Sequence, residues 1–200
     1  LGWFVGDPNK EWGSIVPKVT GGFQNFFDFK GFTLGLTIDY QFGGKFFSLS
    51  EQWGTFSGLM EPTAAINDRG KNVRDDVADG GGVHVRGVDA ADEKTPVDVY
   101  ISAYDYFHQF YYQQIAEPFV HDLSYVKLRE VSLGYKIPVH KIGKLGKVFQ
   151  GAHFSVIARN PWLIYRDSEN FDPSEISSNF GEDGQFPGTR SIGFNLKLNF

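Results

Sequence analysis

The five histidines are the side chains of this sequence with the widest chemical repertoire, and their positions do not suggest a reaction. They are scattered along the chain, at His84, His108, His121, His140 and His153. Metal-binding histidines recur at short intervals, as in H-E-x-x-H, and no such spacing occurs here. The nucleophile motif G-x-S-x-G is missing too, and the chain contains no cysteine. We therefore expect neither an enzyme nor a catalytic, cofactor-binding or metal-binding residue.

Acidic side chains are concentrated in residues 61–98. Three of them could offer carboxylate oxygens to Ca²⁺, namely Asp75, Asp76 and Asp79. A stretch so rich in acids is more typical of a solvated excursion of the chain, and we interpret it in that way. The pair Glu182 and Asp183 has the same interpretation, as loop residues in contact with solvent.

Aromatic side chains are dense in residues 99–114, which hold Tyr100, Tyr104, Tyr106, Phe107, Phe110, Tyr111 and Tyr112. Such a segment favours ordered, packed structure, and its pattern fits either a strand or a short helix. The rings would pack within the segment or against another protein, or they would stack on a sugar ring. The sequence does not identify a substrate-binding residue.

The composition bounds the fold and the kind of partner. The chain has 200 residues, 16% of them aromatic, with 20 Phe, 24 Gly and a single Met, which favours strands and turns over helices. The formal net charge is −5 and no basic patch occurs, so we expect no nucleic-acid partner. No apolar run reaches the roughly 18 residues of a membrane-spanning helix, although membrane-spanning strands leave no such run.

The last residues, 188–200, alternate strictly between apolar and small or polar side chains. Ile192, Phe194, Leu196, Leu198 and Phe200 fall on one face of the predicted strand. Gly193, Asn195, Lys197 and Asn199 fall on the other. A period of two predicts a β-strand with one oily and one wet face.

Residues 19–42 predict a hairpin with a defined register. Lys30 and Gly31 lie between two alternating runs, and glycine suits the second position of a two-residue turn. Phe29 should then face Phe32, and every pair whose numbers sum to 61 should lie opposite. This register gives one mostly apolar and one mostly polar face, and a slip of one residue would mix them.

Two further strands follow at 124–138 and 147–165, joined by a short basic turn at 139–147. Val126 and Leu128 are out of phase with the rest of the first strand, which indicates a bulge. Residues 43–53 could continue the hairpin's second strand beyond a membrane.

The strands approach the 9–11 residues or so that cross a bilayer when tilted. Short and long connections alternate, as in outer-membrane barrels with short periplasmic turns and long outer loops. The wet faces carry residues that a dry core would tolerate poorly, which we predict to face a lumen: Asp39, Glu130, His153, Arg159 and Lys197. For His153 we expect a structural hydrogen bond rather than titration.

The fold class predicted from these strands is all-β, an antiparallel transmembrane β-barrel. About five strands cannot close a barrel, so they would be the last strands of a larger one. The extracellular loops are expected at about 1–17, 54–118 and 166–187. The alternative is a soluble β-sandwich, acting as a secreted carbohydrate-binding module.

Five blocks of the sequence, in this order, resemble one known family. They are GDPNKEWGSIVPKVTGGFQNFFDFKGFTLGL, SYVKLREVSLGYKIP, RNPWLIY, NFDPSE and the terminal FPGTRSIGFNLKLNF. Together they resemble the carboxy-terminal segment of the SusC/RagA family of TonB-dependent outer-membrane transporters. In RNPW the chain departs from the Gln-Asn that is commoner in the family.

The resemblance implies an outer-membrane protein of the Bacteroidota with a barrel of about 22 strands. Residues 1–200 would be the carboxy-terminal part of that single barrel domain, and the amino-terminal plug domain is absent from this chain. The implied partners are a SusD-like surface lipoprotein, the TonB complex acting through the plug, and outer-membrane lipid. The implied substrates are oligosaccharides or oligopeptides. Because the chain starts at Leu1 and not at Met, we expect it to be a piece of a longer protein or a processed product.

The terminal strand has a second predicted role. We expect Phe194, Leu196, Leu198 and Phe200 to face lipid and also to form the signal read by the barrel-assembly machinery. The simpler alternative is that these side chains only contact lipid.

Overall fold

The computed structural model describes residues 2–141, 143–176 and 181–200. Its contacts divide the chain into two compact units. The first, here the sheet unit, comprises residues 14–45, 122–176 and 185–200. The second, here the helical unit, comprises residues 2–13, 46–121 and 181–184.

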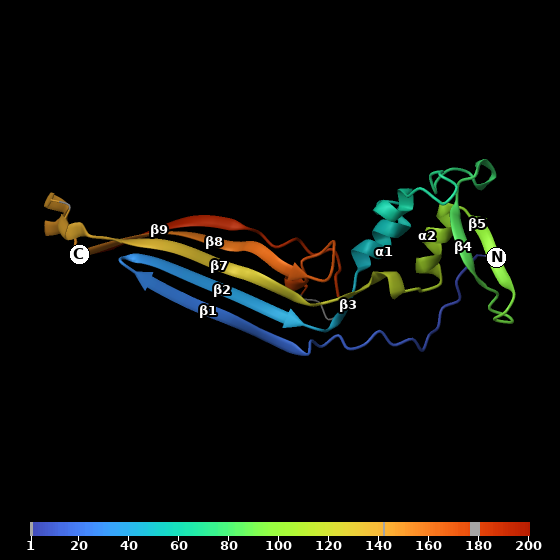
Figure 1. Cartoon of the computed structure of the whole chain (residues 1–200), viewed down its shortest axis with the longest axis horizontal. Coiled ribbons are helices and arrows are strands. Elements are labelled where there is room, and N and C mark those ends of the chain that lie inside the picture. Colours follow the sequence, from blue (N-terminus) through green and yellow to red (C-terminus); the bar gives the residue numbers. More distant parts are fainter. Residues whose placement is uncertain (1, 142, 177–180) are drawn as a thin grey trace. The chain divides into compact units, whose positions relative to one another are not determined.

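The sheet unit is built on five antiparallel strands that lie side by side in the order β1-β2-β7-β8-β9 (Figure 1). They are β1 (Val19–Phe29), β2 (Phe32–Phe42), β7 (Tyr125–Ile137), β8 (Gly151–Arg166) and β9 (Ser191–Asn199). The order of the strands across the sheet is the same as their order along the chain, as in an up-and-down arrangement, although β3 (Lys45–Phe47) to β6 (Val120–Asp122) lie between β2 and β7 in the sequence. The predicted antiparallel sheet is confirmed.

The β1–β2 hairpin has the predicted register. Phe29 pairs with Phe32, and the pairing continues without a break to Val19 and Phe42. Lys30 and Gly31 form the turn with φ values of 49° and 88°, the positive values that a two-residue hairpin turn of this kind requires. The alternation of side chains therefore predicted the pairing of β1 with β2 correctly.

The predicted bulge in residues 124–138 is also confirmed. Ile38 of β2 pairs with Leu128, whereas Thr37 pairs with Glu130, so Arg129 is the extra residue of β7. Pairing with β8 shifts at the same place. The bulge brings Val126 and Leu128 into phase with their neighbours.

The strand predicted from residue 147 begins later. Residues 139–147 form two 3₁₀ turns, η4 (Val139–Lys141) and η5 (Gly143–Lys147), and β8 starts at Gly151. The loop predicted at 166–187 contains η6 (Pro173–Glu175), and its residues 177–180 lie outside the described residues.

The expectation of an all-β chain is corrected: the chain is mostly β, with 43% strand, but 19% of it is helix. The helices lie mainly in the helical unit. Its elements in order are α1 (Leu49–Phe56), η1 (Glu61–Ala64), η2 (Val77–Asp79), β4 (Val83–Val88), β5 (Pro96–Ile101), α2 (Ala103–Tyr112) and η3 (Glu117–Phe119). Strands β4 and β5 form a hairpin, and β3 (Lys45–Phe47) pairs with β6 (Val120–Asp122). In the described part of the chain, no helix has the length and apolar character needed to cross a membrane.

The prediction that residues 43–53 continue the hairpin's second strand is wrong. β2 ends at Phe42, Gly43 and Gly44 follow with φ values of 76° and 87°, and β3 belongs to a different sheet. Ser48 ends β3, because its Oγ accepts a hydrogen bond from the Glu51 amide at 3.1 Å and caps α1.

Residues 99–114, for which the sequence allowed either a strand or a helix, contain both. Ser102 ends β5 and caps α2, accepting from the Asp105 amide at 3.0 Å.

The acidic stretch 61–98 is more ordered than a solvated excursion. Its Val73 packs in the core of the helical unit with Phe107, Phe110 and Phe119. The interpretation is therefore wrong for the apolar positions of this stretch, which composition alone did not separate from the acids around them.

Candidate functional site

One face of the five-stranded sheet carries the residues predicted to line a lumen. In an antiparallel sheet, directly paired residues lie side by side on one face. Thr37, Glu130 and Arg159 form such a row across β2, β7 and β8, and Arg159 Nε donates to Glu130 Oε2 at 3.1 Å. Asp39, two residues along β2, lies on the same face.

A second row of this face centres on His153, which pairs with Lys136 on β7 and with Lys197 on β9. Its Nε2 shares a hydrogen bond of 3.1 Å with Thr33 Oγ1, as expected for a structural histidine. The ring lies against Gly134, where a Cβ atom would come within 2.6 Å of it. All five predicted residues thus share one face, and the enclosure of that face in a lumen stays a prediction.

A network of charges joins this face to the loop that carries η6. Arg129, the bulge residue, donates from Nε to Asp39 Oδ2 at 2.8 Å and from Nη1 to Glu175 Oε1 at 3.3 Å. Lys127 is only 2% exposed, and its Nζ donates to Asp172 and Glu175 at 2.7 Å each. Removing one member of such a group leaves a buried charge without its partner, which is costly.

The loop carboxylates of this network are held ionised. Hydrogen bonding to Lys127 is the main cause that lowers the pKa of Glu175 below its ordinary value. Burial alone would raise the pKa of Asp172, but hydrogen bonds from Lys127 and Ser174 outweigh it, and that pKa is lowered as well. The network is therefore complete at neutral pH.

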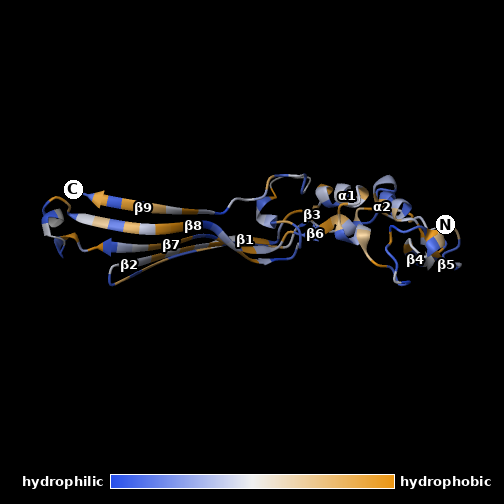
Figure 2. Cartoon of the chain, turned by 90° about the horizontal axis from the view of Figure 1, so that it is seen from above, coloured by the Kyte–Doolittle hydropathy of each residue, from blue (hydrophilic) through white to orange (hydrophobic). Residues whose placement is uncertain are grey.

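The opposite face of the sheet is apolar and exposed. One row runs across all five strands through Phe27, Leu34, Leu133, Val156 and Phe194. The next row is Phe29, Phe32, Tyr135, Phe154 and Leu196. Figure 2 shows the resulting alternation of hydrophobic and hydrophilic residues along β8 and β9.

The residues predicted to face lipid at the carboxy terminus belong to this apolar face. Phe194, Leu196, Leu198 and Phe200 are between 39% and 75% exposed. Contiguous exposed apolar side chains on this scale mark an interaction surface, such as a membrane or another protein. Their roles in lipid contact and in assembly remain predictions.

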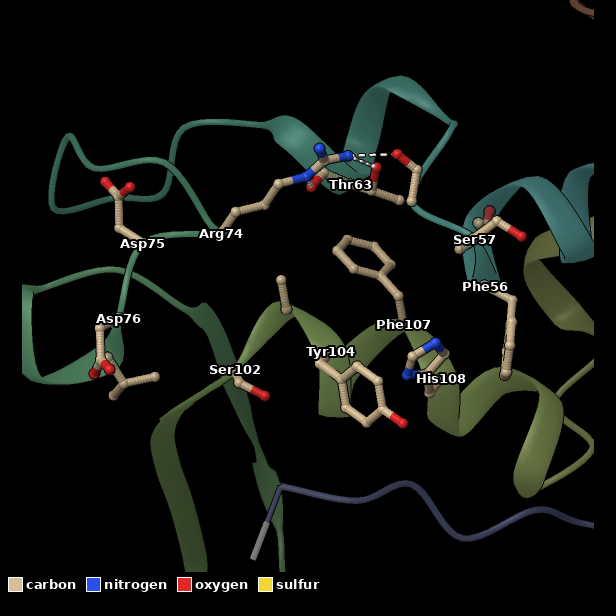
Figure 3. A pocket seen from close by; sticks show the side chains of 14 residues that line it. Phe56, Ser57, Thr63, Arg74, Asp75, Asp76, Ser102, Tyr104, Phe107 and His108 are labelled. Atoms are coloured by element: carbon tan, nitrogen blue, oxygen red, sulfur yellow. Dashed lines mark hydrogen bonds between the residues drawn. The ribbon is translucent and has the colours of Figure 1, made fainter.

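The helical unit contains a pocket of about 760 Å³, drawn in Figure 3. Its lining comes from the end of α1, the loop that follows α1, residues 74–77, and Ser102 with the first two turns of α2. Phe107 is buried in the lining, while Tyr104 is 67% exposed. The His108 ring lies 4.1 Å from that of Phe56 and 3.8 Å from that of Tyr104, between ring centroids. Three rings of the lining are thus held together.

Arg74 fixes the loop that forms one side of the pocket. Its Nε donates to the carbonyl of Thr63 at 2.7 Å, and its Nη2 donates to Thr63 Oγ1 at 2.7 Å and to the carbonyl of Gly58 (Figure 3). Thr63 is 2% exposed. The guanidinium therefore has its Nε and Nη2 committed to the loop.

The acids first considered for Ca²⁺ lie partly in this lining. Asp76 caps η2, accepting from the Ala78 amide at 2.8 Å, and Asp75 accepts from the Asn72 amide at 3.2 Å. Among the residues that the structure describes, no group of three or more His, Asp or Glu side chains could hold a metal ion.

Glu182 is a residue whose role the sequence did not reveal. It is 3% exposed, so its interpretation as a solvated loop acid is wrong. Its carboxylate accepts from Ser48 Oγ and Ser50 Oγ at 2.7 Å, from the Ser50 amide at 3.1 Å and from the Gly184 amide at 2.7 Å. These bonds hold the segment 181–184 at the start of α1, and the favourable interaction of a carboxylate with a helix N-terminus explains the charge there.

A second unpredicted cluster surrounds His84 on the β4–β5 hairpin. Its Nδ1 lies 2.5 Å from Asp68 Oδ2 and its Nε2 lies 2.6 Å from Asp98 Oδ1. Its ring stacks on Tyr100, whose hydroxyl also donates to Asp68. The hydrogen bonds to Asp98 and Asp68 raise the pKa of His84 above its ordinary value. Pairing of β4 with β5 and the Asp68 loop bring these residues together, which spacing in the sequence did not indicate.

The fold is similar to that of chains in solved structures of the RagAB peptide importer. The chain from its 'closed-closed' state has a TM-score of 0.61 and 18% identity, and the match covers 96% of this chain and 18% of that chain. The chain from the 'open-open' state has a TM-score of 0.58 and 18% identity, and the match covers 94% of this chain and 18% of that chain. At this identity the similarity concerns the fold, and this chain spans 18% of the length of the matched chain. No family model and no curated protein match the sequence.

Proposed function

We propose that this chain is part of the wall of a TonB-dependent outer-membrane transporter of the SusC/RagA type, in a bacterium of the Bacteroidota. In this proposal it helps to import oligosaccharides or oligopeptides and catalyses no reaction. Its place in such a transporter is the last strands of the barrel, with the helical unit as an extracellular excursion between strands. The similarity in fold to chains of the RagAB peptide importer supports the proposal.

The observation that carries the proposal is the division of the sheet into two faces over all five strands. Rows of apolar side chains on one face are exposed, and rows of charged and polar side chains lie on the other. A barrel in a bilayer requires this division, because its outside meets hydrocarbon and its inside meets water. The strands have 9 to 16 residues, enough for a tilted strand to cross the bilayer.

The outer edges of β1 and β9 are the two ends of this sheet in the described residues. Open edges with exposed apolar side chains do not persist in hydrocarbon, because every backbone polar group there needs a partner. We propose that further strands of a longer chain pair with both edges and close a barrel of about 22 strands.

The proposed partners follow from the same assignment. A SusD-like surface lipoprotein would cover the extracellular side, in line with the two-component name of the RagAB importer. The TonB complex would act through a plug domain outside these residues, and the barrel-assembly machinery would insert the chain.

The β-sandwich alternative requires a second sheet over the apolar face. In the part of the chain that the structure describes, the other two sheets have two strands each, and Phe194 and Leu196 are exposed. These observations favour the transporter over a carbohydrate-binding sandwich.

Fractionation of cells tests the localisation. The full-length protein should remain with outer membranes after washing with high salt and alkaline carbonate, and it should enter solution only with detergent. A second measurement compares uptake of labelled oligopeptides and oligosaccharides in the parent strain, a deletion strain and a strain lacking TonB. Release of the protein by carbonate, or unchanged uptake of every labelled nutrient in the deletion strain, would refute the proposal.

A further inference from the structure

The pocket of the helical unit has no role in the proposed transport wall. We propose that it is a separate saccharide-binding site, in which Tyr104 stacks on a sugar ring and the charged side chains of the lining bind its hydroxyl groups. The site belongs to the helical unit alone and shares no residue with the polar face of the sheet. This assignment does not depend on transport through a barrel.

The aromatic side of the pocket provides the stacking surface. Tyr104 is 67% exposed although it stands in contact with His108, at an interplanar angle of 80° and 3.8 Å between ring centroids. Phe56 supports His108 from another side at 4.1 Å. A large ring that is held in place by its neighbours and still faces solvent is suited to contact with a ligand, because little side-chain freedom is lost on binding.

The polar side chains of the lining favour a sugar over other small ligands. Each sugar hydroxyl both donates and accepts hydrogen bonds, so its site needs donors and acceptors together. Asp75 and Asp76 supply acceptors, and Ser57 carries a hydroxyl group that acts as either, whereas the Ser102 hydroxyl is committed to Asp105. Arg74 supplies a donor, since its Nη1 makes no hydrogen bond to any described residue while Nε and Nη2 hold the loop. A cationic ligand would need acceptors alone, and a carboxylate would need donors alone.

His108 gives an independent indication that the site is incomplete. Its Nδ1 is buried and has no hydrogen-bond partner among the described residues. Buried polar atoms without a partner are rare and require an explanation. A ligand hydroxyl group would supply the partner once the neighbouring side chains, Tyr104 among them, shift enough to open Nδ1 to it. The pocket volume of about 760 Å³ lies in the range of known ligand sites and accommodates more than one sugar unit.

Binding to the full-length protein, purified in detergent, tests the inference. The probes are maltohexaose, xylohexaose, mannohexaose and galactohexaose, each titrated to about 10 mM by isothermal calorimetry, with an alanine-based hexapeptide under the same conditions. We expect at least one hexasaccharide to bind, and Tyr104→Ala to weaken that binding about tenfold or more. Asp76→Asn keeps an oxygen that can cap η2 and should weaken binding through loss of the charged acceptor.

Tyr165→Ala is the control, because Tyr165 is an exposed tyrosine of β8, 45% exposed, that lies outside the helical unit and does not line the pocket. Its affinity should stay within about twofold of the unmodified protein. Absence of binding by all four hexasaccharides, binding of the hexapeptide alone, or equal losses in Tyr104→Ala and Tyr165→Ala would each overturn the inference. A protein that stays with outer membranes but binds no saccharide would remove this site and leave the proposed transporter intact.

Discussion

His84 is the residue whose surroundings give the clearest dependence on pH. Both of its ring nitrogens face carboxylates, Asp68 at 2.5 Å and Asp98 at 2.6 Å, and the imidazolium form alone can donate to both. Arg86 adds the opposing positive charge, and Tyr100 stacks on the ring. The cluster therefore ties the loop of Asp68 to the β4–β5 hairpin while His84 is protonated.

We predict that this tie stabilises the helical unit at low pH and weakens as pH rises. The folded pKa of His84 is raised, so its contribution is fully present below the ordinary histidine pKa of about 6.5 and is lost as pH rises through the folded value. His84→Gln should lower Tm at pH 5.5 more than at pH 9. The check is a series of thermal unfolding curves, with His140→Gln, an exposed histidine of η4, as control. A loss of Tm that is equal at both pH values would contradict the prediction.

Glu182 shows how one buried carboxylate can organise a helix end. Each of its oxygens faces a backbone N–H group, Oε1 that of Gly184 and Oε2 that of Ser50. In Glu182→Gln one of these oxygens is replaced by an NH₂ group, which is a donor. In either orientation of the amide this NH₂ group faces a backbone N–H group, so that two donors face each other. We expect the free energy of unfolding to fall by about 1–3 kcal/mol.

The measurement is chemical unfolding at neutral pH, with Glu61→Gln, an exposed acid of η1, as the control that should change little. The pKa of Glu182 is lowered: burial opposes this, but hydrogen bonds from Ser50 and Ser48 outweigh it. Its contribution is thus present above the unfolded pKa of about 4.3 and is lost as pH falls through the folded value. A Glu182→Gln protein as stable as the Glu61→Gln protein would show that the carboxylate charge is not needed there.

At the scale of elements, the bulge at Arg129 joins two stretches of β7 whose alternation is out of phase. Deleting Arg129 would move Val126 and Leu128 to the opposite face of the sheet, since side chains alternate with a period of two. The deletion should therefore prevent assembly, whereas Arg129→Ala should keep the register and lose the side-chain bonds to Asp39, Asn160 and Glu175.

The amount of protein in the outer-membrane fraction and its resistance to trypsin distinguish the two variants. We expect little deletion variant in that fraction, and a stable alanine variant that unfolds more readily. Equal amounts and equal resistance of both proteins would mean that β7 tolerates the shift in register.

The sheet could be predicted from the sequence because the turn residues and the alternation of side chains that define its strands lie close together in the sequence. The turn at Lys30 and Gly31 fixed the pairing of β1 with β2, and the change of phase at Val126 and Leu128 located the bulge. Residues 43–53 were harder, because the apolar spacing after Phe47 suits a strand until Ser48 is recognised as a helix cap. Short apolar runs carry this ambiguity between helix and strand.

The helical unit could not be predicted, because its contacts are not local. Phe4 packs near α2, and the core combines Val73 with Phe107, Phe110 and Phe119. Glu182 joins Ser48 across 134 positions of the sequence. The pocket likewise combines residues from either side of the β4–β5 hairpin, and periodicity within one segment cannot indicate such a set.

At the scale of the whole molecule, the proposed function depends on what each face of the sheet contacts. Phe194 and Asn195 are neighbours on β9, both exposed, and they point to opposite faces. Phe194 continues the apolar row of Val156, and Asn195 continues the polar row of Ser155. The same substitution can therefore be made at Phe194 or at Asn195, on opposite faces of the sheet but at nearly the same position along β9.

We predict that Phe194→Arg strongly reduces the protein in the outer membrane, while Asn195→Arg leaves it nearly unchanged. Arginine on the lipid side of a barrel costs about 2–4 kcal/mol near the middle of the bilayer, whereas a water-filled interior accepts the charge. Immunoblots of the outer-membrane fraction and unfolding in urea from lipid vesicles measure the two effects. If the faces were reversed, Asn195→Arg would be the damaging change, and if the apolar face were covered by protein in a soluble fold, neither variant would be found with membranes.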